Sequence, residues 1–260
     1  MNTAVHVGER RKRPESPGRD FPYYAGDPVE VSGRGWLVVL VALGLAFAQL
    51  ELLPLKTFPL DFIPTLLFTG LPLLAVMAVT GGRAPALFRP MGFKGFFTGL
   101  GFGVLTIVSS MIAGLLLTRI MELSSNTAVA DLAAAGVADL LLFLARTFIQ
   151  LIGEELITIL PLLAILWLCV SRFGMSRRWA LALAVIVSTL LFAALHLPTY
   201  NWNVVQCLGT IGTARLVLTM AYIVTRNLWV SATAHIANDW SLFLMSFAGG
   251  HMPIGTDDPI

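Results

Sequence analysis

The sequence predicts an all-α fold, a polytopic membrane helix bundle with about seven transmembrane helices. Of the 260 residues, 57% are hydrophobic and only 12% are charged, whereas about a quarter of a soluble domain's residues are charged. The mean hydropathy is +0.80. The apolar residues also come in repeated blocks of roughly 20, the length that crosses a hydrocarbon layer about 30 Å thick. A soluble protein with one oversized core does not show this pattern.

Residues 1–34 differ in composition from the rest of the chain. They are polar and basic, with the run Arg10-Arg11-Lys12-Arg13 near the start, and they contain no apolar run of the signal-peptide type. We interpret them as a mobile or surface-lying tail whose charge orients the protein in the membrane. A lipid-binding basic patch is the alternative.

Seven apolar segments follow the tail. They run over about 36–54, 58–79, 95–118, 139–170, 179–197, 206–224 and 228–248. The fourth segment is too long for one simple span. It is expected to be either a strongly tilted helix, or an interfacial helix that begins near Asp139 and is followed by a span.

The charges of the loops test this count. Alternate loops contain the basic residues Arg83, Arg89 and Lys94, then Arg172, Arg177 and Arg178, then Arg226. The opposite loops contain only Lys56 and Arg119. Because basic loops remain in the cytoplasm, the N-terminus is predicted to be cytoplasmic and the C-terminus external. The net charge of +2 is small and scattered, so no nucleic-acid partner is expected, and membrane lipid is the expected surrounding.

Small residues mark one face of the third segment, where Gly95, Gly99 and Gly103 repeat every four residues. No strand precedes them and no Lys-Ser/Thr pair follows, which argues against a phosphate-binding loop. Close helix packing is therefore predicted here. The two cysteines, Cys169 and Cys207, have neither a disulfide framework nor metal-ligand spacing and are expected to be packing residues.

Ionisable residues lie within three of the apolar segments, where each costs several kcal/mol by most scales. They are Glu154 and Glu155 in the fourth segment, His196 at the end of the fifth, and His235 with Asn238 and Asp239 in the seventh. His235 lies one helical turn from both Asn238 and Asp239. Groups of this kind are satisfied in lipid only by one another or by water. The sequence therefore predicts a buried polar site between helices.

A glutamate pair with two histidines suits two chemistries. In one, a carboxylate takes a proton from water while an imidazole or amide donor holds the developing oxyanion. In the other, Glu154, His196 and His235 bind a divalent metal such as zinc and leave a position open for water. The alternatives are a structural polar network, or a transporter that uses these groups for proton coupling.

The ordered set Glu-Glu, Phe-x-x-x-His and His-x-x-x-Asn/Asp on successive apolar helices resembles the CPBP family of intramembrane proteases, which includes the CAAX prenyl endopeptidases and bacterial Abi-type proteins. The resemblance covers roughly residues 140–248. It implies a membrane metalloprotease or Glu/His hydrolase that cuts peptide bonds of membrane-associated substrates, and a location in a bacterial inner membrane. It also implies Glu154 as the catalytic carboxylate beside Glu155, with His196 helping to activate water, and His235 with Asp239 as the final motif.

This resemblance divides the chain into four parts. Residues 1–34 form the N-terminal tail, residues 35–135 a transmembrane scaffold, residues 136–248 a CPBP-like catalytic helix bundle, and residues 249–260 a C-terminal tail.

The chain departs from the family pattern at two positions. The motif Glu-Glu-x-x-x-Arg has Ile159 in place of its arginine, so Glu155 is expected either to take a proton or to pair with Arg146 or Arg215. Asp239 stands where Asn is commoner, and an ionised Asp orients His235 or binds metal but does not donate a hydrogen bond. These departures leave an alternative function, that of a catalytically impaired relative acting as a membrane assembly or immunity factor.

The depths of the two histidines conflict if the helices are plain rods. His196 falls at the outer end of its span, while His235 lies roughly 10 Å in from the inner end of the last one. We expect the uncharged loop after Pro198 to dip into the bundle and bring His196 toward His235.

Overall fold

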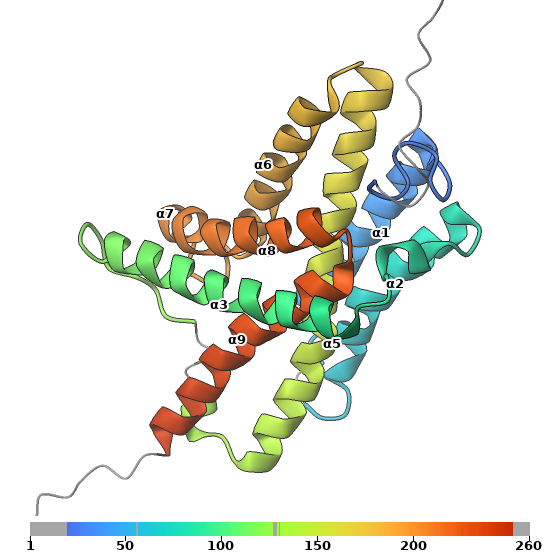
Figure 1. Ribbon diagram of the computed structural model, residues 1–260. Helices are drawn as coiled ribbons and strands as arrows, with labels where there is room; N and C mark the ends of the chain where they lie inside the picture. The colour runs from blue at the N-terminus through green and yellow to red at the C-terminus, as the bar shows by residue number, and fades with distance from the viewer. Residues whose placement is uncertain (1–19, 56, 127–128, 130, 252–260) are drawn as a thin grey trace, which may run out of the picture.

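The computed structural model describes residues 20–251 except residues 56, 127, 128 and 130, and within them it is helical with no strands (Figure 1). The long helices are α1 (Gly33–Leu52), α2 (Phe62–Thr80), α3 (Gly92–Leu117), α5 (Val137–Trp167), α6 (Arg177–Leu195), α8 (Gly212–Thr225) and α9 (Leu228–Gly250). Shorter elements are the 3-10 turns Ala84–Leu87 and Leu132–Ala134, the π-helical turns Leu168–Arg172 and Cys207–Ile211, and α7 (Val204–Gln206). The predicted all-α bundle is confirmed.

Six of these helical stretches are long and apolar enough to cross a membrane. They are Gly33–Leu52, Phe62–Thr80, Gly92–Leu117, Val137–Arg172, Arg177–Leu195 and Val204–Thr225. The seventh long helix, α9, has 23 residues and carries His235, Asn238 and Asp239, which lower its hydropathy. The chain is an integral membrane protein, and which side of the membrane holds its N-terminus remains a prediction.

The long fourth segment is one continuous helix. From Val137 to Arg172 it has 36 residues without a break and is buried mainly from Leu151 onward, so of the two expected forms the separate interfacial helix does not occur. At about 1.5 Å per residue it is longer than the hydrocarbon layer is thick. The helix runs through the middle of the bundle (Figure 1). Glu154 and Glu155 lie in its middle part.

The other helices pack around α5 in two groups. α1 and α2 pack on each other and on α5, and α6 packs on α5 from its own side. α3 instead packs on α8 and α9, and Figure 1 shows α3 and α8 running side by side across the bundle. The segment predicted as a scaffold, 35–135, therefore does not pack as one unit, because its third helix joins the helices that carry the site.

The contact between α3 and α9 depends on glycines. A Cβ atom at Gly99 would lie 2.9 Å from the carbonyl oxygen of Val230, and one at Gly103 would lie 3.0 Å from that of Ala234. Backbone atoms at such distances cannot move aside as a flexible side chain would. The predicted close packing through small residues is confirmed at these two positions.

Replacing Gly99 with alanine should lower the unfolding temperature of the purified protein, because overpacking at a tight contact costs about 1–3 kcal/mol. Gly101 on the same helix has nothing within 4 Å of its Cβ position. The same change there should leave the unfolding temperature unchanged or raise it, since alanine favours helix over glycine by about 1 kcal/mol. Thermal unfolding in detergent compares the two variants, and equal shifts would contradict the packing assignment.

The N-terminal segment 20–32 is part of the core. Phe21, Tyr23, Tyr24 and Val31 are buried, and the Phe21 ring stacks on Tyr222 with 6.0 Å between ring centroids. The interpretation of residues 1–34 as a surface or mobile tail is wrong for residues 20–32, because three aromatic side chains anchor this stretch, and residues 33–34 belong to α1. Residues 1–19 lie outside the described residues.

This segment joins loops that the charge pattern assigned to one side. The Tyr23 hydroxyl donates to the Arg83 carbonyl at 2.7 Å, and the guanidinium groups of Arg177 and Arg226 lie 5.3 and 5.6 Å from the Phe21 ring centroid. The basic loops thus gather at one end of the bundle, as alternate loops of a polytopic protein should.

The attachment of segment 20–32 should depend on pH through Asp20. Burial would raise the pKa of this carboxyl, but hydrogen bonds from Arg177, Tyr24 and the Phe21 backbone outweigh burial and hold the pKa below its usual value. A lowered folded-state pKa stabilises the fold above the unfolded value of about 4, and this stabilisation is lost as the pH falls through the lower value. Amide exchange of residues 21–31, corrected for intrinsic rates, should therefore accelerate below about pH 4, and the Asp20→Asn variant should lack this step.

Candidate active site

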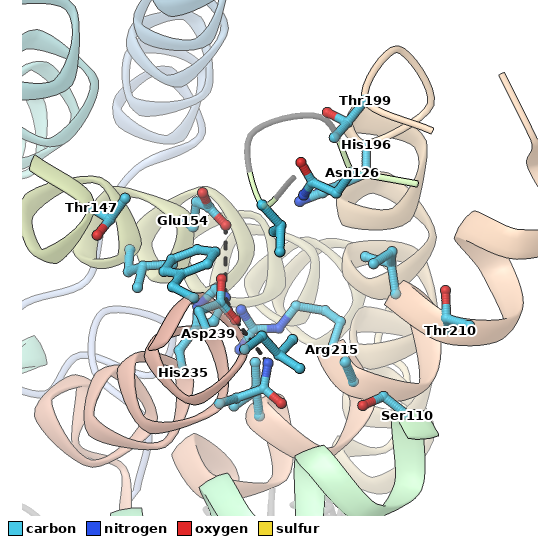
Figure 2. A pocket seen from close by; sticks show the side chains of 18 of the residues that line it. Ser110, Asn126, Thr147, Glu154, His196, Thr199, Thr210, Arg215, His235 and Asp239 are labelled. Carbon is cyan, nitrogen blue, oxygen red and sulfur yellow. Dashed lines mark hydrogen bonds and ion pairs between the residues drawn. The ribbon is translucent and has the colours of Figure 1, made fainter. Parts of the chain in front are cut away.

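A cavity of about 810 Å³ lies between α3, α5, α6, α8 and α9. Its lining includes five of the six predicted site residues, Glu154, His196, His235, Asn238 and Asp239. Figure 2 shows Glu154, His235, Asp239 and Arg215 close together, with His196, Asn126 and Thr199 on the facing wall. The three helices that carry the motifs therefore meet around one space, although their residues are up to 85 positions apart in the chain.

The sixth residue, Glu155, points away from the cavity into the bundle and is fully buried. Both of its oxygens accept hydrogen bonds from Arg215, at 2.7 Å from Nη1 and 3.1 Å from Nη2. Arg215 is fully buried as well. A bidentate pair of this kind is among the stronger ion pairs in proteins. Of the expected partners for Glu155, the structure forms the one with Arg215.

The other arginine expected to pair with Glu155, Arg146, forms an ion pair with Asp61 instead. It lies 3.1 Å from Asp61 at the start of α2 and lines the cavity two turns before Glu154. Ile159, which stands at the position of the family's arginine, is fully buried.

His235 is held by carboxylates on both ring nitrogens. Its Nδ1 lies 2.9 Å from Glu155 Oε1. Because the carboxylate paired with Arg215 is an acceptor, Nδ1 carries the hydrogen. Its Nε2 lies 3.7 Å from both Glu154 Oε2 and Asp239 Oδ1. Glu155 thus fixes the ring so that Nε2 faces the two carboxylates that line the cavity.

Glu154 differs from its neighbour because it faces the cavity. Its side chain is 14% exposed, and its Oε1 accepts a hydrogen bond from Gln150 Nε2 at 3.0 Å. Neighbouring residues of a helix point about 100° apart. One glutamate is therefore neutralised within the bundle, while the other remains accessible to water in the cavity.

His196 reaches the same site from the end of α6. Its Nδ1 lies 2.9 Å from the carbonyl oxygen of Phe192, which can only accept, so the other nitrogen, Nε2, keeps a lone pair. The Phe192 ring centroid lies 4.5 Å from the His196 ring and 6.2 Å from the His235 ring. The two imidazoles therefore lie beside one aromatic ring and line one cavity, and the expected approach of His196 to His235 stays a prediction.

The loop after Pro198 folds back onto the bundle. Thr199 and Tyr200 line the cavity, and Asn203 Oδ1 accepts from the backbone N–H of Gln206 at 3.1 Å. The side chain of Gln206 then bonds both backbone groups of Ser124, at 2.8 and 2.9 Å. These two hydrogen bonds attach the segment after α3 to α7. Asn126 of the same segment lines the cavity.

The final motif is arranged around Asp239. Asn238 Nδ2 donates to Asp239 Oδ1 at 2.8 Å, and the same oxygen lies 3.7 Å from His235 Nε2. The amide of Asn238 is therefore engaged in orienting Asp239. The predicted role of both residues in orienting His235 is compatible with these distances and stays a prediction.

Sequence reasoning missed several residues of the site. Gln150 and Tyr200 lie one turn from Glu154 and His196, so helical spacing could have found them. Asn126 and Ser124 come from a connection with no motif, and only the folded chain places them here. Arg215 was one of two basic residues considered, and spacing alone could not decide between them.

The residues of the metal alternative do not fit a metal site in this arrangement. Across the described part of the chain, no group of three or more His, Cys, Asp or Glu side chains could hold an ion. The carboxylates and imidazoles that line the cavity are the groups that the structure offers for chemistry.

Residues 136–241 match the family model described as type II CAAX prenyl endopeptidase Rce1-like. The predicted family is confirmed over this segment. It contains all six predicted site residues and Arg215, and it begins within one residue of α5. Such a match implies a peptidase. No curated protein and no solved structure matches the chain.

Proposed function

We propose that this chain is an intramembrane endopeptidase that hydrolyses peptide bonds of membrane-associated substrates with water activated by Glu154. The observation that most supports this proposal is the different environment of the two neighbouring glutamates. Glu155 is buried in an ion pair, while Glu154 faces a cavity that also holds His196, His235 and Asp239. A water-accessible carboxylate beside two imidazoles suits general base catalysis.

In the proposed reaction, Glu154 takes a proton from a water molecule, and the water oxygen bonds to the carbonyl carbon of the substrate. His196 accepts a hydrogen bond from the water through its Nε2 lone pair, and His235, when it is protonated at Nε2 as well, donates to the developing oxyanion. Glu154 then gives its proton to the leaving nitrogen as the C–N bond breaks, which releases a new carboxyl and a new amine. Glu155, Asn238 and Asp239 orient His235 throughout.

The cavity supports a substrate that comes from the membrane. Beside its polar end it has apolar walls, formed by Ile107 and Met111 of α3, Leu218 of α8, and Leu242, Phe243 and Met245 of α9. A peptide joined to an apolar anchor would be bound at both ends of such a cavity. The prenylated chains named in the family description are one class of such substrates, and other membrane-anchored peptides are another.

The test is cleavage in water labelled with heavy oxygen. Purified protein in proteoliposomes is mixed with membrane-anchored peptides, with and without a prenyl group, and the products are analysed by mass spectrometry. One labelled oxygen in the new carboxyl group is expected. Stable binding of a peptide without cleavage would contradict the proposal and favour the assembly or immunity function instead.

Chelation should leave the activity within about twofold of its starting value, because the proposed base is a carboxylate that needs no metal. The assay compares turnover before and after prolonged dialysis against EDTA, with zinc added back as the control. Loss of turnover on dialysis and its return with zinc would show that an ion takes part.

A further inference from the structure

The arginine that accompanies the glutamate pair lies on a different helix from the one expected. The family motif has it one turn after the second glutamate, where this chain has Ile159, a fully buried apolar residue. Arg215 comes from α8 instead, 60 positions from Glu155 in the chain. The charge has been relocated and its contact with the carboxylate is bidentate.

We propose that Arg215 is a positioning residue, which replaces the motif arginine from α8 and fixes His235 through Glu155. This inference rests on the proposed peptidase function. Glu155 Oε1 accepts from Arg215 Nη1 at 2.7 Å and lies 2.9 Å from His235 Nδ1. A single carboxylate oxygen thus links the guanidinium to the imidazole.

Arg215 is itself held on two sides. Its Nε donates to Thr219 Oγ1 at 3.3 Å, and its guanidinium carbon lies 5.0 Å from the centroid of the Phe192 ring. That ring is the one that both site histidines contact. The guanidinium therefore supports the site through Glu155 and through Phe192.

The burial of Arg215 separates positioning from substrate binding. Its side chain borders the cavity but is 0% exposed, and its charge is engaged by Glu155, so it is not available to bind a substrate. Loss of Arg215 should therefore change the orientation of His235 and slow the chemical step, while substrate binding stays nearly the same. Residues that orient a reacting group from behind typically change activity by about 10–100-fold.

The test is a double-substitution cycle on purified, monodisperse protein. Arg215→Met should lower kcat by about 10–100-fold with less than about threefold change in KM. Glu155→Gln should do the same, and the double variant should be no slower than the slower single variant, because both act through one contact. Effects on kcat that multiply, or a raised KM with kcat unchanged, would overturn the proposal.

Moving the arginine from position 215 to position 159 should restore part of the activity lost in the Arg215 variant. Arg215→Ile combined with Ile159→Arg restores the family's arrangement, since residues one turn apart on a helix are neighbours. At least tenfold recovery over Arg215→Ile alone is expected, and no recovery in a folded double variant would contradict the proposal. If that variant does not fold, the substitution cycle decides.

A readout without turnover separates this inference from the peptidase function. Nitrogen NMR of histidine-labelled protein should show His235 protonated at Nδ1 in the wild type and altered in Arg215→Met. If the wild type cleaves nothing, the peptidase function is contradicted. The NMR signal of His235 still tests whether Arg215 orients this histidine. An unchanged His235 signal would overturn the positioning role.

Discussion

Replacing Glu154 with glutamine should lower kcat about 1,000-fold, within the range of general acid–base catalysis. The amide has the size of the carboxylate but cannot take a proton from water or return one to the leaving nitrogen. The cavity and the neighbouring ion pair do not depend on Glu154, so folding should be retained. The measurement is the rate of cleavage of a membrane-anchored peptide, with thermal unfolding recorded on the same samples.

Glu51 offers a matched control, because it is an exposed carboxylate near the end of α1. Glu51→Gln should cleave at the wild-type rate. A Glu154→Gln protein that keeps more than about a tenth of the wild-type kcat would contradict the general base role. Equal cleavage rates for the wild type and Glu154→Ala would contradict any catalytic role of Glu154.

Removing one member of the Glu155–Arg215 pair should destabilise the protein by about 3–5 kcal/mol. Either Glu155→Leu or Arg215→Leu leaves the other charge fully buried without its bidentate partner. The double leucine variant removes both charges, and such replacements are often neutral or stabilising. Its unfolding temperature should therefore return close to the wild-type value, although its activity should not.

The pair Arg146–Asp61 serves as the control, since both of its side chains are partly exposed. Leucine at either position should cost no more than about 1 kcal/mol, the range measured for accessible ion pairs. Thermal unfolding in detergent compares the five variants with the wild type. Single Glu155 or Arg215 variants as stable as the wild type would show that water or another group compensates the buried charge.

The site also bears on the alternative of an inactive relative. Its main support was the absent motif arginine at position 159. The structure supplies a guanidinium to the same carboxylate from α8, so this departure from the motif no longer distinguishes an inactive protein. The departure at Asp239 remains, and it is engaged by Asn238.

The sequence alone determined that the chain is a helical membrane protein, because block length and low charge are properties of composition and order. It also indicated five residues that line one cavity, since an ionisable group in an apolar helix is costly wherever the helix packs. The glycine spacing on α3 likewise predicted close packing before the partner helix was known.

Two features could not be predicted from the local sequence pattern, because they depend on tertiary contacts. Composition marked segment 20–32 as polar, but its aromatic side chains are buried, and Phe21 packs against Tyr222, Arg177 and Arg226. The long fourth segment allowed two forms, and only the folded structure shows that it is a single helix.

Only the tertiary structure decided which arginine pairs with Glu155 and that both histidines lie beside Phe192. Arg146 and Arg215 are equivalent in sequence terms, and in the folded chain Arg215 reaches the carboxylate from α8 while Arg146 pairs with Asp61. His196 and His235 line one cavity because the loop after Pro198 folds back and both rings lie beside Phe192. Burial cost shows which residues need partners, but helix crossings determine which partners they find.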